Sequence, residues 1–188
     1  MIKSTGKLLD YKNYRYFSEC FIETGSAAGD GIQRALVADF QDIRSCEGEK
    51  VWFNICATRF KDVPRVTLFL GETKKMLPMM LPPMQQSVVF LDAHPAGPLS
   101  FGHADLMADP ANSEYRQDQI IKSELQLLAA CGVKHLIIID DVNGLADGFA
   151  EQYCEAIGEG YEFFFFDENL SGDPEFYYKE KLLVAIPK

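Results

Sequence analysis

Apolar residues follow two different patterns along the chain. Short segments rich in apolar residues are typical of strands in a sheet covered on both faces, and they occupy residues 20–24, 42–46, 64–70, 87–92, 134–140, 161–167 and 181–186. Between most of these segments apolar residues recur at helical spacing, over residues 30–40, 48–60, 118–130 and 145–157 and in a short helix before 81–83. Strands that alternate with helices predict a mostly parallel sheet with right-handed crossovers.

The end of the chain departs from this alternation. No convincing helix lies between the segments 161–167 and 181–186, so we expect them to pair as an antiparallel hairpin. The predicted fold is therefore α/β: a doubly wound, seven-stranded, mostly parallel sheet with an antiparallel terminal strand, in three α/β/α layers. The length fits a single domain over residues 1–188. Within it, the tyrosine-rich residues 1–19 are expected to form an N-terminal extension that packs on the sheet.

Charge and composition narrow the classes of partner. The net charge is −10 with no cluster of Lys or Arg, which argues against nucleic acid because phosphate backbones require a basic face. No apolar stretch approaches the roughly 20 residues that cross a bilayer, and the first twenty residues lack the apolar core of a secretory signal. We therefore expect a cytoplasmic protein with no membrane partner. The five cysteines are scattered without a C-x-x-C pair, which favours reduced, packed thiols over a zinc site.

A glycine-rich turn joins the first buried segment to the first helix. Its glycines stand at positions 25, 29 and 31, in the spacing G-x-x-x-G-x-G. Glycine accepts positive φ and lets a ligand approach the backbone closely, and the helix that follows points its N-terminal amides at polar or anionic groups. Glu47 lies about 20 residues further on, where nucleotide-binding α/β folds place a carboxylate that accepts hydrogen bonds from ribose hydroxyls. The turn therefore predicts a nucleotide-like ligand.

Acidic residues end each of the central strands. Ligands of open α/β sheets bind outside the carboxyl ends of the strands, so these side chains are expected at one edge of the sheet. They are Glu23, Glu47, Glu72, Asp92, Asp140 and Asp141. The long polar stretch 93–117 follows the fourth of these strands, and loops of that length in compact domains are usually functional or disordered.

From about residue 18 to its end, the chain resembles the class I S-adenosylmethionine-dependent methyltransferases. The pattern E-x-G-x-x-x-G-x-G, which begins at Glu23, resembles their motif I. The resemblance implies that Glu23 binds the amino group of the methionine part, that Glu47 binds the ribose, and that Glu72 lies near the adenine. The complete set of cofactor-binding residues that it implies is Glu23, Thr24, Gly25, Ser26, Gly29, Asp30, Gly31, Glu47, Gly71, Glu72 and Asp92.

The second half of the chain resembles a narrower group, the macrocin and sugar O-methyltransferase-like branch. That resemblance implies a Mg²⁺ ion held by Asp92, Asp140 and Asp141, in an all-oxygen site of the kind that Mg²⁺ prefers. Either Asp92 or His94 could accept the proton of a substrate hydroxyl. Adjacent strand residues face opposite ways unless the chain turns between them, so one of Asp140 and Asp141 could instead cap the next element.

The function expected from the resemblance is O-methylation of a small hydroxylated molecule, assisted by Mg²⁺. With no separate cap domain, the acceptor must be recognised by the N-terminal segment, by residues 93–117 or by a second subunit, as in a homodimer. One alternative is a protein that binds S-adenosylmethionine or its product without methyl transfer. A nucleic-acid methyltransferase is disfavoured by the charge and by Asp92-Ala-His-Pro95, where amino-directed DNA enzymes carry Asn/Asp-Pro-Pro-aromatic. A nicotinamide oxidoreductase is disfavoured by the glycine spacing and the terminal hairpin.

Overall fold

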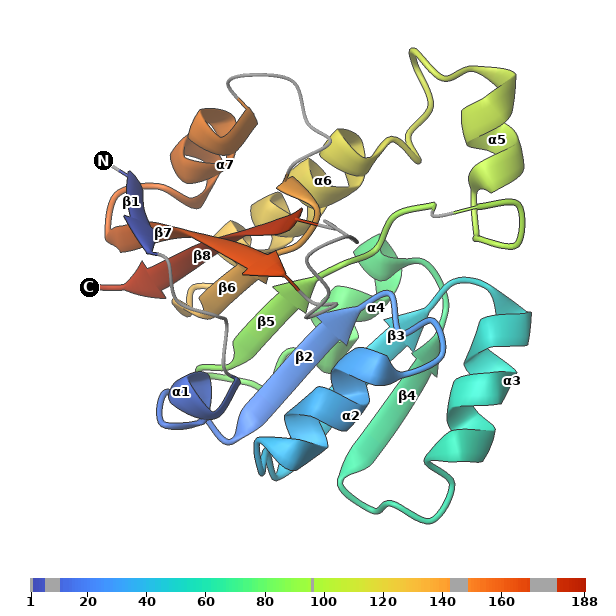
Figure 1. The fold of residues 1–188 in the computed structure, drawn as a ribbon, viewed down its shortest axis with the longest axis horizontal. Helices are drawn as coiled ribbons and strands as arrows, with labels where there is room; N and C mark the ends of the chain where they lie inside the picture. The colour runs from blue at the N-terminus through green and yellow to red at the C-terminus, as the bar shows by residue number, and fades with distance from the viewer. Residues whose placement is uncertain (1, 6–10, 96, 143–148, 170–178) are drawn as a thin grey trace.

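A computed structural model describes residues 2–5, 11–95, 97–142, 149–169 and 179–188. These residues form an eight-stranded sheet in the order β1-β7-β8-β6-β5-β2-β3-β4 (Figure 1). Its strands are β1 (Ile2–Thr5), β2 (Cys20–Thr24), β3 (Asp42–Glu47), β4 (Val66–Leu70), β5 (Val88–Leu91), β6 (Leu136–Ile139), β7 (Tyr161–Asn169) and β8 (Lys179–Pro187).

The directions of the strands confirm the predicted fold. Strand β8 runs antiparallel to both of its neighbours, β6 and β7, and the other pairs in the sheet are parallel. The pairing of β7 with β8 is the predicted terminal hairpin. The seven expected strands are joined by β1, which pairs with β7 at one edge of the sheet and comes from the segment predicted as an N-terminal extension.

Helices cover both faces of the sheet. Helices α1 (Tyr11–Arg15), α2 (Asp30–Val37) and α3 (Lys50–Arg59) contribute to one apolar cluster, and α4 (Thr73–Met80), α6 (Gln117–Ala130) and α7 (Phe149–Ile157) contribute to the other. Adjacent residues of one strand enter different clusters, because side chains alternate between the faces of a strand. Phe21 faces the first cluster and Ile22 the second. Helix α7 lies within the predicted helix 145–157, whose residues 145–148 are outside the described residues.

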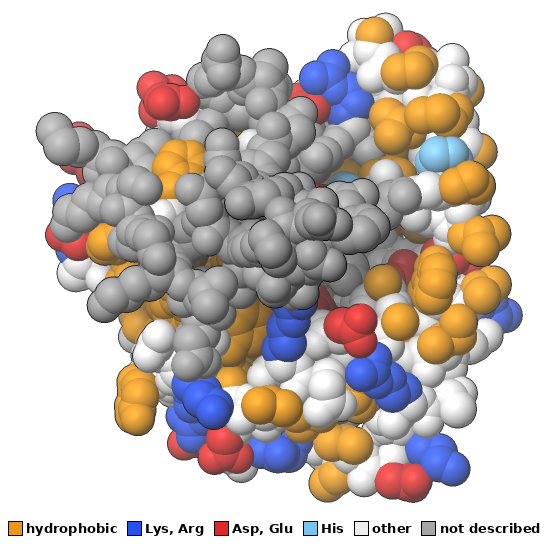
Figure 2. All heavy atoms as spheres, in the orientation of Figure 1, with side chains coloured by type: hydrophobic (Ala, Val, Ile, Leu, Met, Phe, Trp, Pro, Cys, Tyr) orange, Lys and Arg blue, Asp and Glu red, His pale blue; other side chains and the backbone are white. Residues whose placement is uncertain are grey.

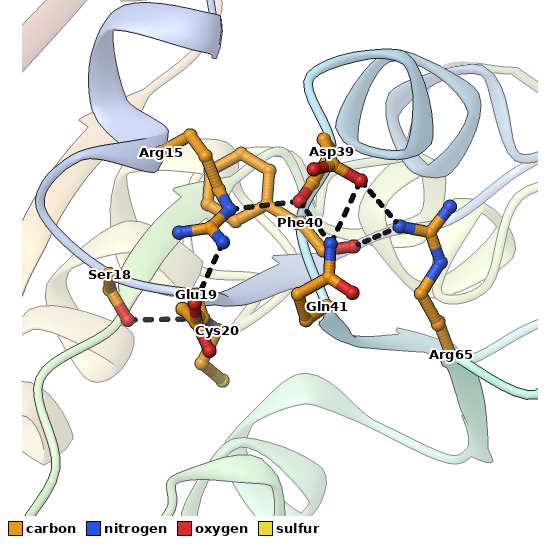
Figure 3. A network of polar contacts seen from close by, with 8 residues as sticks. All are labelled: Arg15, Ser18, Glu19, Cys20, Asp39, Phe40, Gln41 and Arg65. Atoms are coloured by element: carbon orange, nitrogen blue, oxygen red, sulfur yellow. Dashed lines mark hydrogen bonds and ion pairs between the residues drawn. The ribbon is translucent and has the colours of Figure 1, made fainter.

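A network of arginines and acids fastens the amino ends of β2, β3 and β4 (Figure 3). Arg15 Nε of α1 donates to the carbonyl oxygen of Asp39 at 2.8 Å, and its Nη2 donates to Glu19 Oε1 at 2.8 Å. Arg65, just before β4, donates to Asp39 Oδ1 at 3.0 Å and to the carbonyl oxygen of Phe40 at 3.1 Å. The network ties α1 to the connection between α2 and β3. It lies at the amino ends of the strands, and the strand-end acids lie at the opposite, carboxyl ends.

Candidate functional site

A cavity of about 870 Å³ opens at the carboxyl ends of β2, β3, β4 and β5. This volume lies within the range of small-molecule sites, which is roughly 300–1,000 Å³. The strand ends supply one wall, and the segment that follows β5 supplies the opposite one. Six of the residues expected to bind cofactor or act in catalysis line the cavity: Gly25, Glu47, Gly71, Glu72, Asp92 and His94.

The glycine turn packs tightly between β3 and β5. The amides of Gly25 and Ser26 donate to the carbonyl oxygen of Cys46 at 2.9 and 3.0 Å. Gly25 has φ +84°, and a Cβ built on it would lie 2.7 Å from the carbonyl oxygen of Asp92. Gly31 faces inward instead, because a Cβ there would lie 1.7 Å from the carboxylate of Glu23. Only glycine therefore lets this turn approach both the cavity and the core.

Glu23 lies beneath the turn and does not line the cavity. It is 1% exposed, and its Oε2 accepts a hydrogen bond from Ser45 Oγ at 2.7 Å. Burial raises the pKa of Glu23 to about 8, and the Ser45 hydroxyl partly opposes that shift. The other expected residues that lie outside the cavity are Thr24, Ser26, Gly29, Asp30, Gly31, Asp140 and Asp141.

Glu47 joins the glycine turn to the cavity. Its Oε2 accepts the amide of Ala27 at 2.8 Å, and its Oε1 accepts the amide of Glu49 at 2.8 Å. The carboxylate lines the cavity and at the same time closes the turn onto the end of β3. Asp30, by contrast, points away from the cavity to an ion pair with Arg59 at 2.7 Å.

Residues 97–116 cover the cavity and include α5 (His103–Ala108). Tyr115 Oη donates to Glu72 Oε1 at 3.1 Å, and the ring of Phe101 meets the ring of Tyr115 edge-on at 5.6 Å. Phe101 also packs on Gly48, where a Cβ would lie 2.7 Å from its ring. Lys74 pairs with Glu114 across the same boundary. Phe101 and Tyr115 belong to no motif in the sequence, and the only signal for them is that they are aromatic residues within the long polar stretch.

The cover exposes apolar side chains to solvent. Leu99 is 67% exposed and Met107 is 56% exposed. Figure 2 shows orange apolar side chains gathered over α5 along the right side of that view. Clustered apolar side chains on a surface often mark a place where another molecule binds.

His94 lies between two carboxylates. Its Nε2 is 3.0 Å from Asp141 Oδ2, and its Nδ1 is 3.7 Å from Asp92 Oδ1. The hydrogen bond to Asp141 is the main cause that raises the pKa of His94, and His94 in turn lowers the pKa of Asp141. Asp141 reaches this position because the chain turns there, with φ +54°, and its amide donates to Asp140 Oδ1 at 2.7 Å.

Two of the three expected magnesium ligands, Asp92 and Asp141, therefore lie on either side of His94. Within the described residues, no group of three or more His, Cys, Asp or Glu side chains is placed to hold a metal ion. Asp141 is bound to His94, and Asp140 accepts a backbone amide. As arranged, this donor set does not fit the octahedral, oxygen-only site that Mg²⁺ requires.

Comparison with known proteins assigns the fold. No family model and no curated protein matches the chain. Among solved structures, the O-methyltransferase TomG from Streptomyces achromogenes in complex with SAM is 13% identical with a TM-score of 0.55, over 94% of this chain and 79% of that one. The SAH-bound methyltransferase PaMTH1 of Podospora anserina is 13% identical with a TM-score of 0.55, over 95% and 75%.

A spermidine synthase bound to the transition-state analogue AdoDATO is also similar, at 11% identity and a TM-score of 0.52, over 88% of this chain and 52% of that one. At such identities the likeness concerns the fold alone. The chain has the Rossmann-like fold of class I S-adenosylmethionine-dependent methyltransferases, as its strand order and antiparallel β8 also indicate. In the part of the chain that the structure describes, no helix combines the length and the apolar character needed to span a bilayer.

Proposed function

We propose that the protein is an S-adenosylmethionine-dependent methyltransferase that methylates a hydroxyl group of a small molecule. The observation that carries the proposal is the cavity at the carboxyl edge, where Gly25 and Glu47 form one wall. Gly25 packs so closely on the end of β5 that a Cβ atom would not fit there. The cavity wall at this point is therefore bare backbone, which a ligand can approach closely. The SAM-bound and SAH-bound neighbours of the same fold support this assignment.

The residues present fit an adenosyl ligand. The backbone at Gly25 would face the methionine part, and Glu47, which lines the cavity, would accept the ribose hydroxyls. Glu23 does not reach the cavity, so it would support the ligand indirectly, by packing against Gly31 beneath the glycine turn. The cofactor supplies a methyl group on a sulfonium, which is activated toward a nucleophilic oxygen. The protein's own task is to position the acceptor and to remove its proton.

His94 and Asp92 are the two candidates to accept that proton. Both line the cavity, and Asp141, which lies outside the cavity lining, orients the imidazole through its contact with His94 Nε2. When bound, S-adenosylmethionine would supply the methyl group and leave as S-adenosylhomocysteine, because its S–CH3 bond breaks as the O–CH3 bond forms. His94 or Asp92 would accept the hydroxyl proton of the acceptor. Magnesium assistance is not part of the proposal, because Asp141, one of the three expected ligands, is already bound to His94.

The proposal keeps the partners that the sequence predicts. A small-molecule acceptor is expected, with no nucleic acid and no membrane, in a cytoplasmic protein. The apolar side chains of residues 97–116 offer a surface for the acceptor or for a second subunit in a homodimer.

One observation favours a second candidate, a protein that binds the cofactor without methyl transfer. Asp141 raises the pKa of His94, so the imidazole holds its proton more firmly and is less available as a base. The two candidates differ in turnover of labelled S-adenosylmethionine with hydroxylated acceptors, which only the methyltransferase supports.

A thermal-shift panel with S-adenosylmethionine, S-adenosylhomocysteine and NAD tests the cofactor class. At about 100 times its Kd, a ligand of the native protein adds about 2.7 kcal/mol to the free energy of unfolding. We expect stabilisation by both adenosyl ligands and none by NAD, unchanged when Mg²⁺ is added. Stabilisation by NAD alone would contradict the proposal.

A further inference from the structure

Helix α6 carries a carboxylate that is buried beneath the cavity. Glu124 is 0% exposed, while Ile120, one turn earlier, and Ser123 line the cavity. Its neighbours on the helix, Ile121 and Leu125, belong to an apolar cluster. Burial raises the pKa of Glu124 to about 7. Burying a carboxyl group in apolar surroundings is costly, so its retention calls for a role.

The described contact of Glu124 is with a residue of the cavity wall. Thr73 Oγ1 donates a hydrogen bond to Glu124 Oε1, and Thr73 lines the cavity. The hydroxyl of Thr24 is also close enough to lower the pKa of Glu124. Within the described residues, Glu124 Oε2 has no hydrogen-bond partner.

This contact fixes the hydrogen-bonding character of Thr73. A hydroxyl has one donor and two acceptor lone pairs. Because Glu124 takes the single donor of Thr73, the hydroxyl can offer the cavity only its lone pairs. Without Glu124 the hydroxyl could rotate and present either character to a ligand.

Backbone donors lie beside this acceptor. Thr73 is the first residue of α4, and the side chain of its N-cap residue, Glu72, makes no capping hydrogen bond. The carboxylate of its N-cap residue, Glu72, is engaged by Lys75 at 2.8 Å and by Tyr115. The first amides of a helix have no partner within the helix. The start of α4 therefore presents the Thr73 hydroxyl as an acceptor next to backbone amides that are free to donate. This pair complements the edge of an aromatic ring that carries an amino group, which donates, beside a ring nitrogen, which accepts.

We propose that Glu124 is a positioning residue that fixes Thr73 as the acceptor for the exocyclic amino group of the adenine ring. The inference rests on the proposed function, since it concerns the adenosyl ligand of the same cavity. It gives this role to Thr73, whereas the resemblance to class I methyltransferases implied that Glu72 lies near the adenine. A 6-oxo purine presents an acceptor and a ring N–H at the same edge, so the arrangement selects against it.

The test compares two ligands, S-adenosylhomocysteine and its 6-oxo analogue S-inosylhomocysteine, by calorimetric titration. The wild-type protein should bind the amino ligand about 10-fold or more tightly than the 6-oxo ligand, as expected when a buried polar group is left mismatched. Thr73→Val and Glu124→Met should reduce this ratio to about 1–3. Thr73→Ser should keep the wild-type ratio because it keeps the hydroxyl.

Thr58→Val is the matched control, because the Thr58 hydroxyl on α3 donates to the carbonyl oxygen of Asn54 away from the cavity. Its ratio should equal that of the wild type. An unchanged ratio in Thr73→Val, with binding retained, overturns the inference alone. Absence of binding of either ligand by the wild type overturns the proposed function and this inference with it. If Glu124→Met does not fold, Thr73→Val and Thr73→Ser decide the question.

Discussion

The parallel strands begin at the amino edge of the sheet and end at its carboxyl edge, and these two edges use acidic residues in opposite ways. At the amino edge, Glu19 and Asp39 are held by the guanidinium groups of Arg15 and Arg65. At the carboxyl edge, Glu23 and Glu47 accept hydrogen bonds from a hydroxyl and from backbone amides. Ion pairs at the first edge neutralise charge and fasten elements. At the second edge, backbone amides hold the Glu47 carboxylate beside the cavity without neutralising its charge, which favours a cationic ligand such as a sulfonium.

The difference also appears in burial. Asp39 keeps three quarters of its side chain exposed, while Glu23 is fully buried. Exposed ion pairs contribute little to stability, whereas buried carboxylates cost free energy unless they are satisfied. The amino edge is therefore the tolerant end of the molecule, and the carboxyl edge is the end where substitutions should have large effects. Substitutions at the two edges test that contrast.

Removing the histidine between the carboxylates should affect turnover most. If His94 accepts the proton, His94→Ala should lower kcat about 10²–10⁴-fold and change the Kd for S-adenosylhomocysteine little. His103→Ala, on α5 and outside the cavity lining, is the control and should retain activity. Full activity of His94→Ala would leave Asp92 as the candidate base. Steady-state kinetics and calorimetric titration provide the two measurements.

The turn at Gly25 should tolerate no side chain. Gly25→Ala places a Cβ 2.7 Å from the carbonyl oxygen of Asp92 at φ +84°, which should cost about 2–3 kcal/mol in the free energy of unfolding. Gly97→Ala is the control, because no atom of the residues that the structure describes lies within 4 Å of its Cβ position. Urea denaturation should show a loss for Gly25→Ala and no more than about 0.5 kcal/mol for Gly97→Ala. Equal stabilities would contradict the described turn.

The buried carboxyl of Glu23 should make stability depend on pH. Its pKa is raised from 4.5 to about 8 in the folded protein, so the folded state holds a proton that the unfolded state has lost. Its contribution to stability is therefore complete below pH 4.5 and is lost as the pH rises toward 8. Glu23→Gln should flatten this part of the profile of urea midpoint against pH. The Glu124 carboxyl, shifted in the same direction, should leave a smaller residual slope.

At the amino edge the expected effect is small. Arg15→Ala removes the hydrogen bonds to Glu19 and to the carbonyl oxygen of Asp39, at a cost of about 0.5–1.5 kcal/mol in the free energy of unfolding. Binding of S-adenosylhomocysteine should not change, because the network lies at the other end of the sheet. A loss of affinity in Arg15→Ala would break the contrast between the two edges.

The fold was predictable from the sequence because the buried strands and the amphipathic helices leave distinct periodicities. Strand β5, for example, lies within the predicted segment 87–92, and β8 pairs with β7 as expected. The site was predictable only in part. A strand sends alternate side chains to opposite faces, and the sequence did not reveal that Glu23 enters the core while Glu47 lines the cavity.

Contacts between distant segments could not be predicted either. The packing of Phe101 on Gly48 and the hydrogen bond from Thr73 to Glu124 join residues about 50 positions apart. No periodicity encodes such pairs, because they depend on how the cover of residues 97–116 and helix α6 fold back over the sheet. The turn at Asp141 is similar, since its positive φ brings an acid to His94 that a straight strand would direct elsewhere.

The most direct test of the cofactor site is a calorimetric titration of S-adenosylhomocysteine into the wild-type protein, Glu47→Ala and Glu49→Ala. Glu47 lines the cavity and holds the glycine turn, whereas the Glu49 side chain accepts the amide of Val51 at the start of α3. We predict one ligand bound per wild-type chain, affinity about 10–100-fold weaker in Glu47→Ala, and near wild-type affinity in Glu49→Ala. No binding by the wild type, or equal affinities in the two variants, would contradict the account.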